Sequence, residues 1–396
     1  MTTNSHRRVA IFIEVKKVKE IGMYIHIPFC KQKCAYCDFP SFEGREAELD
    51  DYVAALLVEL KEWYIPLKDY QIKSVFLGGG TPSLLSISQL NAILEGIYRW
   101  FSLKSAAEIS IEANPGTLDR VKLEYYHHHG INRLSIGLQA WQNQLLKVLG
   151  RIHTQQEFID NYYAARAAGF KNISVDLMFG LPDQTFEDWK ETLHQVLQLK
   201  PDHVSAYSLK IEEGTPFDRL YGQGKLILPE EDLERDMYHY ALDLLEQHKY
   251  RHYEISNFAL ADKESTHNKI YWNNEEYIGL GVGAHSFLNK VRFSNVVDIR
   301  QYNERLQRQK SPVVERHQIS VEEEISETIF LGLRMMEGID RNQFLRRFQV
   351  DPMVKYKNQI LEFTGQGLLV INGDRLCLTK KGIDVSNRVF ASFLPE

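Results

Sequence analysis

The chain has 396 residues, of which 44% are hydrophobic and 25% are charged, enough for one large catalytic domain and a smaller second domain. Its formal net charge of −6 excludes a global positive field that would recruit nucleic acid or an anionic membrane. No apolar run approaches the roughly 20 residues needed to cross a bilayer, and the polar start lacks a secretory signal, so we expect a cytoplasmic protein that does not span a membrane.

The first two thirds of the chain predict an α/β fold. We interpret residues 1–22 as a dispensable extension and Met23 as a candidate for the true start. Amphipathic stretches, such as 46–63 and 186–199 with Thr185 as N-cap, predict helices between short apolar runs. This alternation predicts a parallel sheet, and six such units lead us to prefer a partial, open (β/α)6 TIM-like barrel, although a doubly wound sheet would give the same pattern. The runs that predict its strands are 24–27, 75–77, 109–111, 134–136, 173–178 and 204–209.

The remainder predicts a second domain. We place the core domain at 23–290, a charged connector at 291–320 and a mostly helical domain at 321–396. That domain begins with a helical run over Glu322 to Met336 and ends with a hairpin whose turn is Asn372-Gly373-Asp374, which together resemble a winged helix. Residues 322–396 contain ten Lys or Arg and eleven Asp or Glu, so a role in packing or partner binding is favoured over DNA binding.

Three of the four cysteines lie within eight residues, at Cys30, Cys34 and Cys37. Three thiolates on one short loop can converge on one inorganic centre, and an iron–sulfur cubane that normally takes four cysteines would keep one iron open for a small ligand. A zinc site completed by His26 is the alternative, but such sites usually divide their ligands between two separated pairs. Cys377 stands in a distant apolar run and is given no role.

The spacing C-x3-C-x2-C, with aromatic Tyr36 before the last cysteine, resembles the radical S-adenosylmethionine (SAM) superfamily. The resemblance implies a [4Fe–4S] cluster whose open iron is chelated by the amino and carboxylate groups of SAM. It also implies that an electron from the cluster cleaves the sulfonium to give a 5′-deoxyadenosyl radical, while the protein holds and orients the cofactor.

Polar side chains at successive strand ends fit that ligand. The glycines at 78–80 allow close backbone approach, Glu112 can accept from a ribose hydroxyl or an ammonium, and Arg151 can pair with a carboxylate. Gln139 and Asp176 can add further polar contacts. Each feature alone could be purely structural, since the glycines can form a tight turn and Glu112 can cap a helix. Together they favour SAM binding.

Longer strings resemble the group around oxygen-independent coproporphyrinogen III oxidase: YIHIPFCKQKCAYCDFPSF, GGGTPSLL, IEANPGTL, NRLSIGLQ, SVDLMFGLP and EISNFA. The resemblance runs from about Tyr24 to the C-terminus. The assignment of Ala206 and His285 to the SAM site rests on this resemblance alone. With Tyr36 of the cluster motif, the positions that it implies for SAM are Tyr24, Gly79, Gly80, Thr81, Glu112, Gln139, Arg151, Asp176, Ala206 and His285.

Within this group the chain resembles the HemW proteins more than the oxidases. The oxidases continue the motif with a fourth cysteine where this chain has Phe39, and they have a longer arm before the cluster than the 29 residues here. The string HNKIYW, with His267, Tyr271 and Trp272, matches the HNxxYW string of HemW proteins. The resemblance implies a heme chaperone that delivers heme to membrane respiratory proteins.

The HNxxYW string has two interpretations. His267 can be an axial ligand of heme iron, with Tyr271 and Trp272 covering a porphyrin face. Alternatively, His267 and Asn268 cap a turn while the two aromatic rings pack into the core. The alternative function is a radical SAM enzyme that acts on a tetrapyrrole, such as an oxidative decarboxylase of coproporphyrinogen III.

Overall fold

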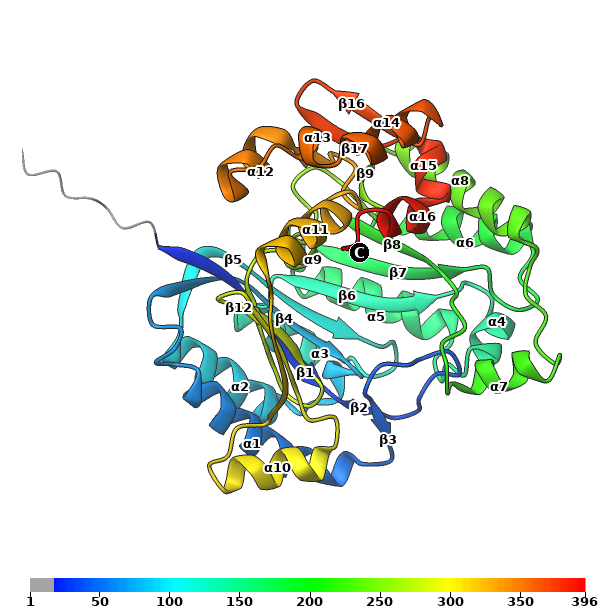
Figure 1. Ribbon diagram of the computed structural model, residues 1–396. Helices are drawn as coiled ribbons and strands as arrows, with labels where there is room; N and C mark the ends of the chain where they lie inside the picture. Colours follow the sequence, from blue (N-terminus) through cyan, green and yellow to red (C-terminus); the bar gives the residue numbers. More distant parts are fainter. Residues whose placement is uncertain (1–17, 396) are drawn as a thin grey trace, which may run out of the picture.

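The computed structural model describes residues 18–395, and most of them surround a single twelve-stranded sheet (Figure 1). Six of its strands are parallel and lie side by side in chain order, as expected for an open barrel. The predicted partial (β/α)6 barrel is therefore confirmed. These strands are β1 (Lys19–Ile27), β4 (Tyr70–Gly79), β5 (Ser102–Ala113), β6 (Arg133–Gln139), β7 (Ile173–Phe179) and β8 (His203–Ser208).

Helices cover the outer face of the barrel (Figure 1), and several of them begin at side-chain caps. Thr185 accepts a hydrogen bond from the backbone of Asp188 at the start of α6, which confirms the predicted N-cap. The outer helices and connecting elements are α1 (Leu49–Glu62), α2 (Ile87–Trp100), α3 (Arg120–His128), α4 (Asn143–Val148), α5 (Gln155–Ala167), α6 (Phe186–Leu199), α7 (Pro216–Gly222), α8 (Glu231–Gln247) and α9 (Thr266–Trp272).

Strands that the sequence did not predict extend both edges of the sheet. The segment predicted as a connector, 291–320, contains two of them and helix α10 (Ile299–Gln307), all joined to the core. Side chains of the outermost strand are mostly exposed and polar, so its sequence has no apolar alternation to indicate a strand. The added strands are β11 (Tyr277–Leu280), β12 (His285–Leu288), β13 (Val291–Asn295) and β14 (Val313–Gln318) on one edge, with β10 (Asn257–Ala259) and β9 (Arg251–Glu254) on the other.

The C-terminal part has its own apolar core and a small antiparallel sheet, with strand order β15-β17-β16. The predicted hairpin is confirmed as β16 (Leu369–Asn372) and β17 (Arg375–Leu378). The predicted end of the first helix at Met336 is wrong, because Met335 leaves the helix to form a bridge with Glu254. The other elements are α11 (Val321–Gly332), β15 (Ile339–Asp340), α12 (Arg341–Phe348), α13 (Pro352–Lys355), α14 (Lys357–Gly365), α15 (Lys380–Asp384) and α16 (Ser386–Ala391).

No helix of residues 18–395 combines the length and the apolar character needed to cross a membrane. The prediction that residues 1–22 are dispensable concerns residues 1–17, which lie outside the described part of the chain, and the start of β1. Within β1, Lys19, Glu20 and Ile21 pair with β4, and Ile21 is completely buried.

A chain that starts at Met23 should therefore be less stable than one that starts at Val18. The truncation removes the buried Ile21 side chain and the first pairs of the β1–β4 ladder, and losses of this kind cost about 2 to 5 kcal/mol. Denaturant unfolding of the two chains measures the difference. Equal midpoints would show that the first strand residues contribute nothing.

Candidate functional site

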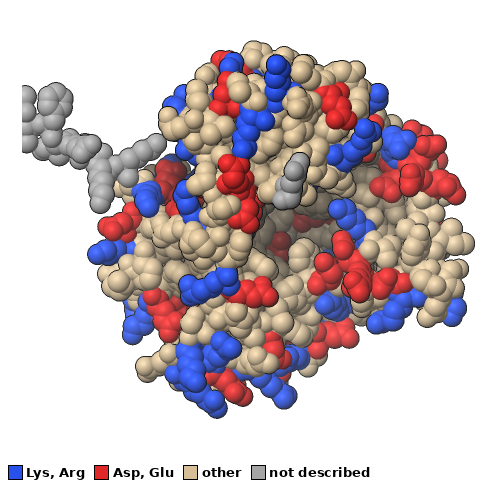
Figure 2. All heavy atoms as spheres, viewed as in Figure 1, with Lys and Arg blue, Asp and Glu red and all other residues tan. Residues whose placement is uncertain are grey.

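The interior of the barrel is lined by small polar side chains. Successive residues of a strand face opposite sides, so on β6 the buried Leu134 and Ile136 face the helices while Ser135 donates to Asp176 of β7. TIM barrels usually fill this space with bulky branched residues. Here the small side chains leave room, and Figure 2 shows a hollow between the C-terminal domain and the barrel strands, with acidic side chains inside it. The interior serines are Ser74, Ser110, Ser135, Ser174 and Ser205.

The three clustered cysteines lie on one loop at the carboxyl end of β1. Short strands β2 (Phe29–Cys30) and β3 (Phe42–Glu43) pair at its base. The loop is also tied to the loop after α4, because Ala35 N donates to Leu149 O at 3.0 Å and Gln32 Nε2 donates to Gly150 O at 2.9 Å. The fold therefore presents all three thiols at the end of the barrel where the strand-end residues gather.

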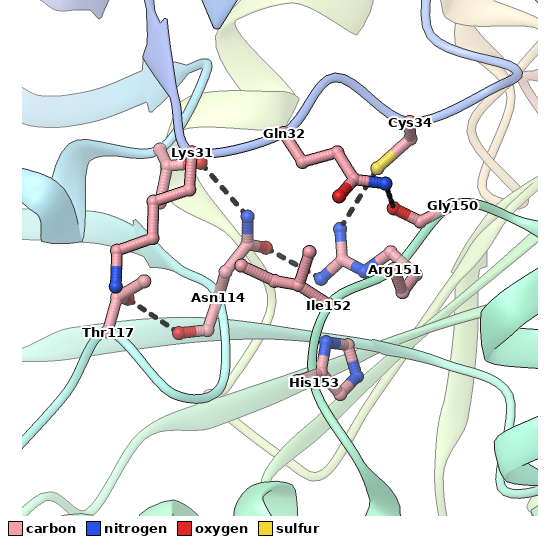
Figure 3. A pocket seen from close by; sticks show the side chains of 10 residues that line it. Lys31, Gln32, Cys34, Asn114, Thr117, Gly150, Arg151, Ile152 and His153 are labelled. Atoms are coloured by element: carbon pink, nitrogen blue, oxygen red, sulfur yellow. Dashed lines mark hydrogen bonds between the residues drawn. The ribbon is translucent and has the colours of Figure 1, made fainter. Parts of the chain in front are cut away.

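Hydrogen-bond donors face two of the thiols. Arg151 Nη1 lies 3.6 Å from Cys34 Sγ (Figure 3). Thr81 Oγ1 donates to Cys30 Sγ at 3.5 Å. Asn114 joins the two donors, since its Oδ1 accepts from Arg151 at 2.7 Å and its Nδ2 donates to Thr81 at 2.9 Å. Sequence reasoning missed Asn114, although it stands in the EANP string directly after a strand.

This donor set fits a [4Fe–4S] cluster. Burial raises the pKa of Cys30 and of Cys37, so these thiols need a bound metal to be deprotonated at neutral pH. Arg151 and Thr81 then supply the hydrogen bonds that an anionic set of thiolates requires. In a cubane each cysteine binds a different iron, so the three sulfurs need not meet at one ion.

A zinc site completed by His26 is not supported. Both ring nitrogens of His26 are engaged, Nδ1 with the Tyr24 hydroxyl at 2.9 Å and Nε2 with the carbonyl of Pro40 at 2.8 Å. Burial lowers the pKa of His26 to about 4, so the ring is neutral and positions Tyr24. In the described chain no three His, Cys, Asp or Glu side chains are placed to hold one metal ion.

Glu112 closes the glycine-rich turn after β4. Its Oε2 accepts a hydrogen bond from Gly79 N at 3.0 Å, and burial, followed by the charge of Asp176, raises the pKa of Glu112 to about 8. The glycines are required by packing. Gly79 has a φ of +107°, and a Cβ there would lie 2.3 Å from the His26 ring, while a Cβ at Gly80 would lie 2.7 Å from Phe29 O.

The other positions predicted to bind SAM differ in the burial and the contacts of their side chains. Asp176 accepts hydrogen bonds from the serines at 135, 174 and 205, and Gln139 ends β6 with a φ of 71°. The Ala206 side chain is 1% exposed and packs in the apolar core, so only its backbone can reach a ligand in the barrel. His285 is exposed at the start of β12, and the Tyr36 ring lies 6.5 Å from the Phe217 ring.

The HNxxYW string forms helix α9, and His267 within it is buried. Its Nδ1 lies 2.8 Å from Ser74 Oγ and its Nε2 lies 2.9 Å from the Tyr271 hydroxyl. Burial lowers the pKa of His267 to about 3, so its ring is neutral. Ser265, not His267, caps the helix. In this arrangement neither ring nitrogen is free to ligate iron, whereas Tyr271 and Trp272 are only partly buried.

Known proteins match the chain over nearly its whole length. The heme chaperone HemW of Bacillus subtilis is 37% identical over 94% of this chain and 99% of its own length. The chain belongs to the HemW family. HemW of Escherichia coli is 35% identical over 96% of this chain and 100% of its own length. The Danio rerio radical S-adenosyl methionine domain-containing protein 1, mitochondrial, is 30% identical over 95% and 87%.

Family models and a solved structure agree with this HemW assignment. The Radical SAM superfamily model matches residues 24–196, and the HemN C-terminal domain model matches residues 319–385. The structure of coproporphyrinogen III oxidase (HemN) from Escherichia coli, a radical SAM enzyme, covers 95% of this chain and 90% of its own with a TM-score of 0.83. At 22% identity that likeness shows the fold alone. The superfamily implies a [4Fe–4S] cluster and SAM.

Proposed function

We propose that this chain is a cytoplasmic heme-binding chaperone that carries a [4Fe–4S] cluster and SAM and delivers heme to a respiratory membrane protein. The observation that carries the proposal is a set of tyrosine rings at the polar barrel interior of a HemW-family chain. The rings of Tyr24, Tyr207 and Tyr271, from β1, β8 and α9, keep exposed surface although protein surrounds them. The Trp272 ring is partly buried and lies against the Arg334 guanidinium. A flat apolar ligand with polar edges suits such rings.

The cluster would be held by Cys30, Cys34 and Cys37. When bound, it supplies an electron and one open iron position to SAM. Arg151 holds a positive charge beside Cys34 and is fixed by Asn114 and the carbonyl of Gly137. This arrangement stabilises the anionic form of the site and keeps the guanidinium directed at sulfur.

Glu112 and Asp176 would hold the cationic and hydroxyl groups of SAM. Glu112, on β5, accepts from Gly79 N at the end of β4, and an N–H of the ligand's amino group can replace the proton that its raised pKa retains. Asp176 is already oriented by three serine hydroxyls, so its carboxylate needs little reordering to accept from a ligand.

Binding of SAM should strengthen as the pH rises from 6 to 8. Below the Glu112 pKa of about 8 the carboxyl of the free site is protonated, and it must lose that proton to accept from the amino group of the ligand. The affinity should therefore rise by up to about tenfold per pH unit and level off above about 8. Calorimetric titration of the reconstituted protein measures the profile. Glu112→Gln should flatten it, and an unchanged profile in this variant would contradict the role of Glu112.

Transfer of heme tests the delivery step. We expect the heme-loaded protein to give its heme to the apo form of a membrane-bound respiratory cytochrome, seen as the absorption spectrum of the cytochrome. The alternative function predicts that anaerobic incubation with coproporphyrinogen III, reductant and SAM forms protoporphyrinogen. We expect no such product, and its formation together with failed transfer would reverse the proposal.

A further inference from the structure

Arg133 places a positive charge inside the barrel that the proposed roles above do not use. It is the first residue of β6 and is 2% exposed. It lies on the same face of the strand as Ser135, whose hydroxyl donates to Asp176, and it stands opposite Ser110 in the β5–β6 register. The side chain therefore belongs to the polar interior and not to the apolar face under the helices.

The guanidinium of Arg133 has no partner among the described residues. Its Nε is buried without a hydrogen bond, and no carboxylate of residues 18–395 forms an ion pair with it. Arg166, which is outside the barrel interior, shows the usual arrangement, with Nη1 at 2.6 Å from Asp202. A buried charge without a partner is unfavourable, and such groups are kept where they meet a ligand.

The surroundings of Arg133 favour an anion. Its positive charge lowers the pKa of His203 and of His267, which burial already holds neutral, so neither ring is a competing cation. The Ser110 hydroxyl is also buried and has no hydrogen-bond partner within residues 18–395. Glu112 and Glu108 flank Ser110 on β5; the raised pKa of Glu112 leaves it protonated at neutral pH, and Glu108 accepts from Thr266 N and His267 N. The pair Arg133 and Ser110 thus offers donors for anionic oxygen.

A planar guanidinium matches a carboxylate best, because two parallel N–H groups can donate to its two oxygens. This inference rests on the proposed function, whose ligands carry two kinds of carboxylate. They are a propionate of the tetrapyrrole and the methionine carboxylate of SAM. Arg133 and Gln139 lie at opposite ends of β6, about 20 Å apart at about 3.3 Å per residue. The methionine carboxylate belongs at the cluster end, so the propionate suits Arg133.

We propose that Arg133 binds a propionate carboxylate of the tetrapyrrole inside the barrel. Hemin and hemin dimethyl ester, whose propionates are blocked, are the two probes. The wild-type protein should bind hemin at least about tenfold more tightly than the ester, and Arg133→Gln should remove that preference by weakening hemin binding alone. Arg133→Lys keeps the positive charge but lacks the two parallel N–H groups, so it should recover part of the preference for hemin over the ester.

Two further measurements separate propionate binding from its alternatives. The melting temperature tests whether Arg133 has a structural role, and SAM binding tests whether it recognises the methionine carboxylate. Because Arg133 has no partner among residues 18–395, Arg133→Gln should have an unchanged or higher melting temperature, whereas the control Arg166→Gln should melt lower and bind hemin as the wild type does. A comparable loss of stability in Arg133→Gln would show a structural residue and overturn the proposal.

Weaker SAM binding with unchanged hemin binding would show that Arg133 binds the methionine carboxylate instead. A wild-type protein that binds neither probe contradicts the proposed function itself.

Discussion

Replacing His267 with alanine should lower the free energy of unfolding by about 3 kcal/mol and leave the absorption spectrum of the heme complex unchanged. The substitution removes a buried ring and leaves Ser74 Oγ and the Tyr271 hydroxyl without their partner. The spectrum should stay because both ring nitrogens are already engaged inside the protein.

The pH dependence of stability gives a second readout of His267. Its pKa falls from the usual value near 6.5 to about 3 on folding, so the unfolded chain takes up the proton first as the pH falls. The native state should lose about 2 kcal/mol from this group between pH 7 and pH 5, and the variant should lack that loss. His128→Ala, an exposed position, is the control. A shifted heme spectrum in a folded His267→Ala protein would instead show axial ligation.

Replacing Cys34 with serine should abolish the cluster and, with it, SAM binding. Only three thiols lie on the loop, so no spare cysteine can take the position, and Arg151 would lose the sulfur that it faces. Cys377→Ser is a matched control, because this buried thiol packs in the separate C-terminal domain. Iron and sulfide analysis after anaerobic reconstitution measures the effect. A full cluster content in Cys34→Ser would contradict the three-cysteine assignment.

Much of the barrel could be predicted from the sequence because each parallel strand is a short apolar run between amphipathic helices. The edge strands could not. Strand β14 is mostly polar and exposed, and β10 has only three residues, so neither carries a periodic signal. The end of α11 was also missed, since the bridge between Met335 and Glu254 is a tertiary contact.

Some features of the candidate site could likewise be predicted from the sequence, and others depend on tertiary contacts. Motif spacing was enough to group the cysteines. It also grouped Glu112 with Asp176, whose charge acts on Glu112, although Asp176 stands in the middle of β7 and not at its end. The burial of His267 depends on Ser74 and Tyr271, and local sequence does not show that both ring nitrogens find partners. Arg133 looks like an ordinary strand-start residue until the register places it inside the barrel.

Titration of the anaerobically reconstituted protein with hemin tests the central proposal most directly. We predict a saturable change in the heme absorption spectrum at one heme per chain, with higher affinity in the wild type than in Arg133→Gln. A heme spectrum that stays equal to that of free hemin throughout the titration would contradict the account.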